Sequence, residues 1–164
     1  MSYISRSVVE SALDTFLSQP AVLFGTTRSR LEWINFYLTK SDATSYQNMK
    51  YAFANAVIPT GFRILITESD GTTAYDSSKS DSANVFTNVG KIALRAGSTT
   101  DSAYVINENH NTRPEIMQAL QSSDGYGSSL RYSKSVDDVL QYYVLRVGNA
   151  QGVPVGCVRG SIPN

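Results

Sequence analysis

The sequence predicts an α+β fold, because helical and strand patterns occupy separate stretches of the chain. Apolar residues recur at helical spacing through the first sixty residues. From Phe62 onward the pattern changes to a period of two, interrupted by an Asp70-Gly71 pair that is typical of a hairpin turn. Further strand-like runs follow Gly125 and continue to the end of the chain. Helices are therefore expected first, and strands of one sheet after them.

The N-terminal segment, residues 1–59, is expected to be helical and to pack on the rest of the chain. Three capping-box sequences, in which a hydroxyl and a later acid or amide bond free backbone amides, predict helix starts. They begin at Ser7, Ser29 and Thr44. Gln19-Pro20 and Phe24-Gly25 indicate breaks between these helices.

Residues 60–164 are expected to form one structural unit with five strands and a central helix. The first strand begins at Phe62, and the others are predicted at Thr73–Asp76, Ser128–Ser133, Val139–Val147 and Val153–Ser161. The central helix is predicted at Thr112-x-x-Glu115, with Pro114 in its first turn, and a short helix around Val89–Leu94.

Four segments, in this order, resemble the extracytoplasmic sensor domains of bacterial histidine kinases. They are Arg63–Ser77 with its D-G turn at Asp70 and Gly71, Asn109-His110 followed by Arg113-Pro114-Glu115-Ile116, Tyr126–Ser133, and Val155–Pro163. The resemblance covers roughly residues 60–163. It implies a PAS/Cache-like fold, a five-stranded antiparallel sheet with helices on one face, in which Asp70, Gly71, Asn109, Arg113 and Pro114 are structural motif positions.

Tyr75–Lys79 together with Ile106–Pro114 also resembles small stand-alone proteins of large icosahedral DNA viruses. In those proteins a PAS-like fold serves as a minor capsid component. That resemblance implies a non-enzymatic structural protein of the virion, made in the host cytoplasm, whose partners are other capsid or assembly proteins. The alternative is a soluble cytoplasmic module of Cache type that senses a small molecule and acts through a separate partner chain.

Composition narrows the classes of partner. The chain has 14 basic and 14 acidic residues, and charged residues make up 17%, against about a quarter in typical globular chains. Nucleic-acid binding needs a basic stripe, so it is not expected. No stretch approaches the roughly 20 apolar residues of a membrane span, and no signal peptide is evident. The single cysteine, Cys157, excludes an internal disulfide and is expected to be a buried, inert thiol.

The sequence carries no catalytic motif, and no enzyme activity, metal or cofactor is expected. The lone histidine, His110, is a candidate general base or ligand, although a hydrogen bond to the loop before the central helix is the simpler role. Glu108 and Asp101 form a candidate carboxylate pair, with a solvated loop as the alternative.

Ligand-binding candidates follow from the sensor resemblance, in which aromatic and basic side chains between the sheet and the central helix hold small anions. The residues that this implies are Arg131, Tyr132, Tyr142, Arg146 and His110. Alternation places Tyr142 and Arg146 on one face and Tyr143 on the other, so only a subset can line one pocket. The alternative is a filled core. Arg113 is expected to brace the loop that precedes the central helix.

Overall fold

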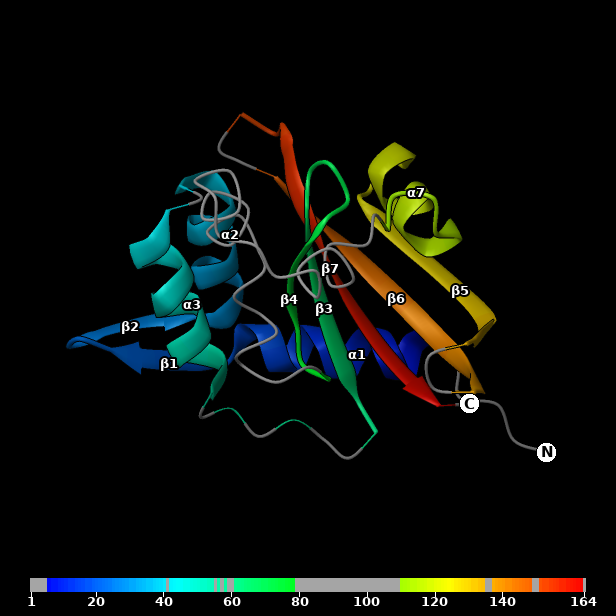
Figure 1. Ribbon diagram of the computed structural model, residues 1–164, viewed down its shortest axis with the longest axis horizontal. Coiled ribbons are helices and arrows are strands. Elements are labelled where there is room, and N and C mark those ends of the chain that lie inside the picture. The colour runs from blue at the N-terminus through cyan, green and yellow to red at the C-terminus, as the bar shows by residue number, and fades with distance from the viewer. Residues whose placement is uncertain are drawn as a thin grey trace, which may run out of the picture.

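The fold is α+β and PAS/Cache-like, with a five-stranded antiparallel sheet between two layers of helices (Figure 1). The computed structural model describes residues 6–40, 42–54, 56, 58, 61–78, 110–134, 137–148 and 151–163. Three predictions lie outside these residues: the short helix around Val89–Leu94, the Glu108–Asp101 pair, and the motif position Asn109. Among the described helices, none is both long and apolar enough to cross a membrane.

The N-terminal segment contains helices and also a hairpin that the sequence did not predict. Its elements are α1 (Arg6–Ser18), β1 (Pro20–Leu23), β2 (Thr26–Ser29), α2 (Arg30–Lys40) and α3 (Ala43–Ala54). Strands β1 and β2 pair antiparallel, with Leu23 opposite Thr26. The two residues between them, Phe24 and Gly25, have φ of 52° and 75°. Two successive left-handed residues form a tight hairpin turn, so the predicted break between helices at this pair is a hairpin that separates α1 from α2.

Local capping explains where α2 and α3 begin. The Ser29 hydroxyl accepts a hydrogen bond from the Glu32 amide at 3.1 Å, as its capping box predicts. The predicted cap at Thr44 is shifted by two residues, because the carboxylate of Asp42 accepts the Ser45 amide at 2.7 Å. A carboxylate is at least as good an N-cap as a threonine hydroxyl, so the helix begins at the earlier residue.

The main sheet has the strand order β4-β3-β7-β6-β5, and all neighbouring strands are antiparallel. Its strands are β3 (Arg63–Glu68), β4 (Thr73–Asp76), β5 (Tyr126–Ser133), β6 (Asp138–Gly148) and β7 (Pro154–Pro163). The central helix, α7 (Pro114–Gln121), precedes β5 in the chain. The last strand therefore lies at the centre, between β3 and β6, and the sheet confirms the predicted fold class.

The two faces of the sheet bury different cores. One face packs against the N-terminal helices in a large apolar cluster, in which Leu13 and Phe16 of α1 meet Ile64, Ile66 and Val158. The other face carries α7 and a small cluster of Ile116, Ala119, Val144 and Cys157. Leu65, Leu140 and a set of polar and charged residues occupy the rest of this second face, which we call the α7 face.

Candidate functional site

Strand register places a set of charged side chains on the α7 face. Arg159 on β7 is opposite Leu65 on β3 and Val144 on β6, and Val144 is opposite Gly127 on β5. Cross-strand partners point to the same side of a sheet, and so do residues two positions away along each strand. The α7 face therefore also carries Arg63, Ser129, Arg131, Tyr142 and Ser161.

Helix α7 is positioned so that its first turn meets these side chains. Pro114 occupies the start of the helix, where a missing amide proton has no consequence. Gly127 on β5 lies directly under the helix, and a Cβ there would overlap the carbonyl oxygen of Glu115. The absence of a side chain at Gly127 lets α7 approach the sheet closely enough for Glu115 to reach β5 and β7.

The Glu115 carboxylate is fully buried and accepts four hydrogen bonds. Arg131 donates Nε to Oε1 at 3.0 Å and Nη2 to Oε2 at 2.9 Å. Arg159 donates Nη1 to Oε2 at 2.9 Å, and the Ser129 hydroxyl donates to Oε1 at 2.8 Å. Burial alone raises the pKa of Glu115, but these bonds and the charges of Arg159 and Arg131 lower it to about 2.

Tyr142 lies beside both guanidinium groups. The Arg131 guanidinium carbon is 4.2 Å from the centre of the Tyr142 ring, and that of Arg159 is 4.6 Å from it. Cations attract the electron-rich face of an aromatic ring, and more strongly when water is excluded. We call Glu115, Ser129, Arg131, Tyr142 and Arg159 the arginine–glutamate cluster.

Arg159 has an unused donor. It is 4% exposed, and its Nε has no hydrogen-bond partner in the described part of the chain. Its Nη1 is bonded to Glu115, so Nε points along a different edge of the guanidinium. Burial lowers the pKa of Arg159 while the charge of Glu115 raises it, and the net direction is downward. Arginine remains a cation at any ordinary pH, so this is a buried charge with donor capacity to spare.

A second ion pair lies on the neighbouring strands. Arg63 donates Nε and Nη2 to the two carboxylate oxygens of Asp76, at 3.0 and 2.6 Å. Burial raises the pKa of Asp76, but the bond and charge of Arg63 outweigh it, so the pKa is lowered overall. Among the described residues, the α7 face carries four guanidinium groups, those of Arg63, Arg131, Arg146 and Arg159, and three carboxylates, those of Asp76, Glu115 and the exposed Asp138. Counted over these residues alone, the face is positive, which favours an anion.

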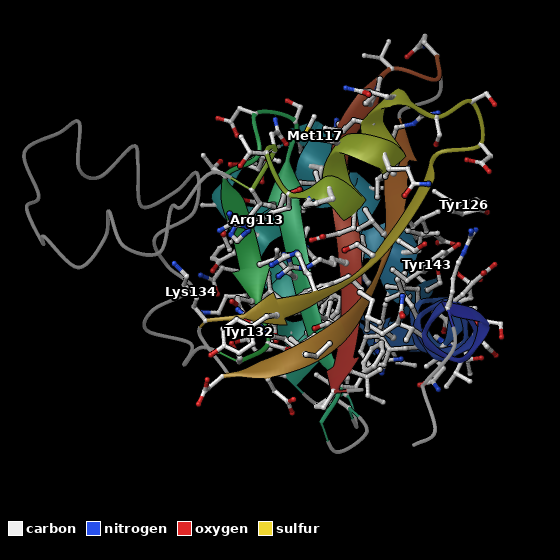
Figure 2. The ribbon with its side chains drawn as sticks, turned by 90° about the vertical axis from the view of Figure 1, so that its right-hand side faces the viewer. Arg113, Met117, Tyr126, Tyr132, Lys134 and Tyr143 are labelled. Atoms are coloured by element: carbon white, nitrogen blue, oxygen red, sulfur yellow. The ribbon has the colours of Figure 1, made fainter. Side chains whose placement is uncertain are left out.

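The predicted ligand-binding residues are distributed over several places. Arg131 and Tyr142 belong to the cluster. Tyr132, the next residue after Arg131, points to the opposite face and is exposed at the end of the β5–β6 hairpin, where its hydroxyl donates to Asp137 (Figure 2). Tyr143 lies beside α1 on that opposite face, as alternation predicts (Figure 2).

Arg146 and His110 are tied to the backbone around α7. Arg146 shares the α7 face with Tyr142, and its Nη1 donates to the carbonyl oxygens of the last α7 turn, including Ser122 at 2.9 Å. The buried His110 donates its backbone amide to the Gly71 carbonyl at 2.8 Å, and its own carbonyl accepts the Arg113 amide at 3.0 Å. These contacts join the β3–β4 turn at Asp70-Gly71 to the start of α7.

Sequence reasoning did not single out Arg159 or Arg63, and it assigned Glu115 to a capping box. Arg113 stands at the N-cap position without a side-chain cap, because a guanidinium has only donors and cannot accept a backbone amide, and the Glu115 side chain turns to the sheet. The buried thiol of Cys157 has its pKa raised to about 12 by burial, as expected of an inert cysteine. Among the described residues, no group of three His, Cys, Asp or Glu side chains could hold a metal ion.

No protein-family model and no curated protein matches the chain. Several solved structures are similar at 12% identity. The ligand-binding domain of the Pseudomonas aeruginosa amino acid chemoreceptor PctB, in complex with L-Arg, matches 80% of this chain and 45% of its own, with a TM-score of 0.43. The ligand-binding domain of chemoreceptor PctC of the same organism, in complex with GABA, matches 96% of this chain and 56% of its own, with a TM-score of 0.42.

An extracellular ligand-binding receptor from Desulfohalobium retbaense matches 97% of this chain and 26% of its own, with a TM-score of 0.43. The chain therefore spans about half, or less, of the length of these three structures. Two of the three are ligand-binding domains of chemoreceptors and the third is an extracellular ligand-binding receptor, and the likeness of this chain to them is a distant one in fold.

Proposed function

We propose that this protein is a small-molecule-binding module of the sensory type, which holds a small anionic ligand on the α7 face. The observation that carries the proposal is the buried guanidinium of Arg159, whose Nε has no partner in the described residues. A buried donor without a partner loses the free energy of a hydrogen bond. A ligand carboxylate that accepts this proton would restore the bond and neutralise the excess charge.

The energetics of buried ions support a binding role over a purely structural one. Removing two charges from water costs several kcal/mol per ion, and apolar residues of similar volume often hold a fold together equally well. Apolar residues in place of the ion pair would have extended the small apolar cluster under α7 across this face. Groups of buried, charged side chains with shifted pKa values are common at functional sites, and Glu115 and Arg159 form such a group.

The cluster also has a side that reaches solvent. The Arg131 side chain is 26% exposed, whereas Arg159 is almost fully buried. A ligand entering past Arg131 would meet one cation at the surface, the Tyr142 ring beside it and a second cation behind. This arrangement fits a small ligand with an anionic group and an apolar or cationic remainder that can contact the ring.

A thermal-shift screen tests the proposal. The panel contains acetate, dicarboxylates, amino acids including L-Arg and GABA, phosphate, and amines without an acid group. At 100 times Kd a ligand stabilises by about 2.7 kcal/mol, or roughly 5–10 °C for a chain of this size. We expect carboxylates to raise the melting temperature and amines to have no effect. Flat curves across all acids would overturn the proposal.

A pair of matched variants locates the binding site. Arg159→Met removes the unused donor and should abolish the carboxylate-induced shift. Arg28→Met removes an arginine that lies over Trp33 and Phe36 on the other layer of the molecule, and should keep the shift. An equal shift in both variants would place any ligand away from the α7 face.

The second candidate function is that of a non-enzymatic interaction protein. The β1–β2 hairpin carries Val22 and Phe24, which are 76% and 79% exposed and are the kind of apolar side chains that interfaces bury. None of the similar structures described above is a capsid protein, so a virion partner remains only an expectation from the sequence. The variant Val22→Ser/Phe24→Ser should lose assembly with the native partner, and unchanged assembly would exclude the hairpin as the interface.

A further inference from the structure

We propose that Glu115 is an internal competitor for the ligand: its carboxylate binds the same Arg159 guanidinium whose Nε a ligand carboxylate would use, and ligand binding weakens the attachment of the first turn of α7. This inference rests on the proposed function and adds how binding on the α7 face would be transmitted.

The Glu115 carboxylate is bound as a small carboxylate ligand would be. Two oxygens of an ionised carboxylate offer about four acceptor sites, and Glu115 uses all four. Every donor comes from β5 or β7, and none from α7 itself. The fork of Arg131 is the bidentate arrangement that arginine makes with free carboxylates. The first turn of α7 thus delivers a carboxylate into an anion site on the sheet.

The other attachments of α7 are the bond of the Arg113 amide to the His110 carbonyl, just before the helix, and the contacts from Ile116 onward. Ile116 and Ala119 pack on Val144 and Cys157, which is a small cluster compared with the core on the other face. The last turn is held by Arg146 through three carbonyl oxygens. Loss of the Glu115 contacts would remove the polar attachments of the first turn to β5 and β7, while the last turn kept its bonds to Arg146.

Charge makes the competition reciprocal. Arg159 holds Glu115 through Nη1 and would hold the ligand through Nε, so the two carboxylates share one cation. Like charges on a shared cation repel, so each weakens the binding of the other. Linkage requires that if the ligand weakens the docking of Glu115 by some factor, docked Glu115 weakens ligand binding by the same factor. A variant without the Glu115 charge should therefore bind the ligand more tightly.

The test uses acetate as the probe, because it is the free equivalent of the Glu115 side-chain group, with chloride to match ionic strength. Three proteins are compared: the unaltered chain, Glu115→Gln, and the matched control Asp76→Asn. Both variants remove one negative charge from the α7 face, but Asp76 bonds Arg63 and does not hold α7. Acetate affinity is followed by NMR titration, and the stability of α7 by hydrogen exchange of its backbone amides.

We expect acetate at saturation to speed exchange in the first turn of α7 of the unaltered chain by about tenfold, leaving the last turn unchanged. Glu115→Gln should bind acetate about tenfold tighter, and Asp76→Asn only about two- to threefold tighter, since charge alone acts there. The exchange measurement on the unaltered chain stands even if Glu115→Gln fails to fold.

Saturable acetate binding with exchange in α7 slowed or unchanged would overturn this inference and leave the proposed function standing. Equal tightening by the two variants would also overturn it, because charge alone would then explain the effect. Absence of saturable binding of acetate, and of every acid in the thermal-shift panel, would instead overturn the proposed function.

Discussion

At the scale of single residues, Glu115 shows how neighbours reverse the effect of burial. A carboxylic acid in an apolar site is normally harder to ionise, yet two guanidinium groups and a hydroxyl lower the pKa of Glu115 to about 2. The negative charge therefore persists in the folded protein at any pH where it folds well. The arginine–glutamate cluster consequently makes stability depend on pH in acid.

The direction of that dependence follows from linkage. The pKa of Glu115 is lower in the folded chain, about 2, than its ordinary value of 4.5, so its contribution is complete above pH 4.5 and is lost as pH falls toward 2. The difference corresponds to on the order of 3 kcal/mol. Urea unfolding at a series of pH values should show stability falling across this window.

The variant Glu115→Gln checks the assignment of that pH dependence. It should be less stable than the unaltered chain at pH 6 by about 3 kcal/mol, because two arginines lose their buried partner. Its stability should also change less between pH 4.5 and pH 2, with Asp76 supplying the remaining slope. If the stability of the variant fell with pH as steeply as that of the unaltered chain, the acid dependence would have to come from other carboxylates.

Residue-level reasoning from the sequence named two of the five residues in the arginine–glutamate cluster. Arg131 and Tyr142 were candidates through the resemblance to sensor domains, in which aromatic and basic side chains lie between the sheet and the central helix. Arg159 could not be connected with them. It lies beside β6 only because β7 pairs between β3 and β6, and this strand order is set by tertiary structure. Glu115 fits a capping box equally well, and only the closeness of α7 to the sheet turns its side chain to Arg131 and Arg159.

At the scale of elements, the approach of α7 to β5 depends on Gly127. Substitution Gly127→Ala would push the helix away, because the added Cβ would overlap the Glu115 carbonyl oxygen and lie 2.8 Å from the Ala119 amide. We expect a loss of about 2–3 kcal/mol in chemical unfolding, together with weaker ligand binding. Gly148→Ala is the control: its Cβ would meet nothing closer than 3.6 Å, and its effect should stay within about 0.5 kcal/mol.

The β1–β2 hairpin shows why one element was missed. Its turn uses Phe24 and Gly25, whereas the sequence signal for such turns is Asn-Gly or Asp-Gly. Phenylalanine at positive φ is strained, and asparagine adopts that conformation more easily. Phe24→Asn should therefore stabilise the fold by about 0.5–1 kcal/mol, measured by urea unfolding, and a loss of stability would argue against this turn.

At the scale of the whole molecule, the segment before β3 supplies one wall of the main core. Side chains of α1, α2 and α3 cover a full face of the sheet, from Ile66 on β3 to Tyr143 on β6. We therefore expect the boundary near residue 60 to be a change of secondary structure and not a boundary between separately stable parts. The alternation of apolar residues in β3 to β7 could be predicted from the sequence. The face of the sheet on which the N-terminal helices pack could not.

Truncation tests this dependence. A fragment of residues 61–164 would expose Ile64, Ile66 and Val158, and we expect it to aggregate or to lack the near-UV signal of packed tyrosines. The full chain should unfold in one cooperative transition. A soluble, cooperatively folded fragment would contradict the account and restore two separable parts.

The central claim, that Arg159 offers an unused buried donor to a ligand anion, is tested most directly by NMR of its Nε–H group. When the best acid from the thermal-shift panel is added, the account predicts a downfield shift of the Arg159 Hε resonance and slower exchange of that proton with water. A ligand that binds saturably while this resonance and its exchange rate stay unchanged would contradict the claim.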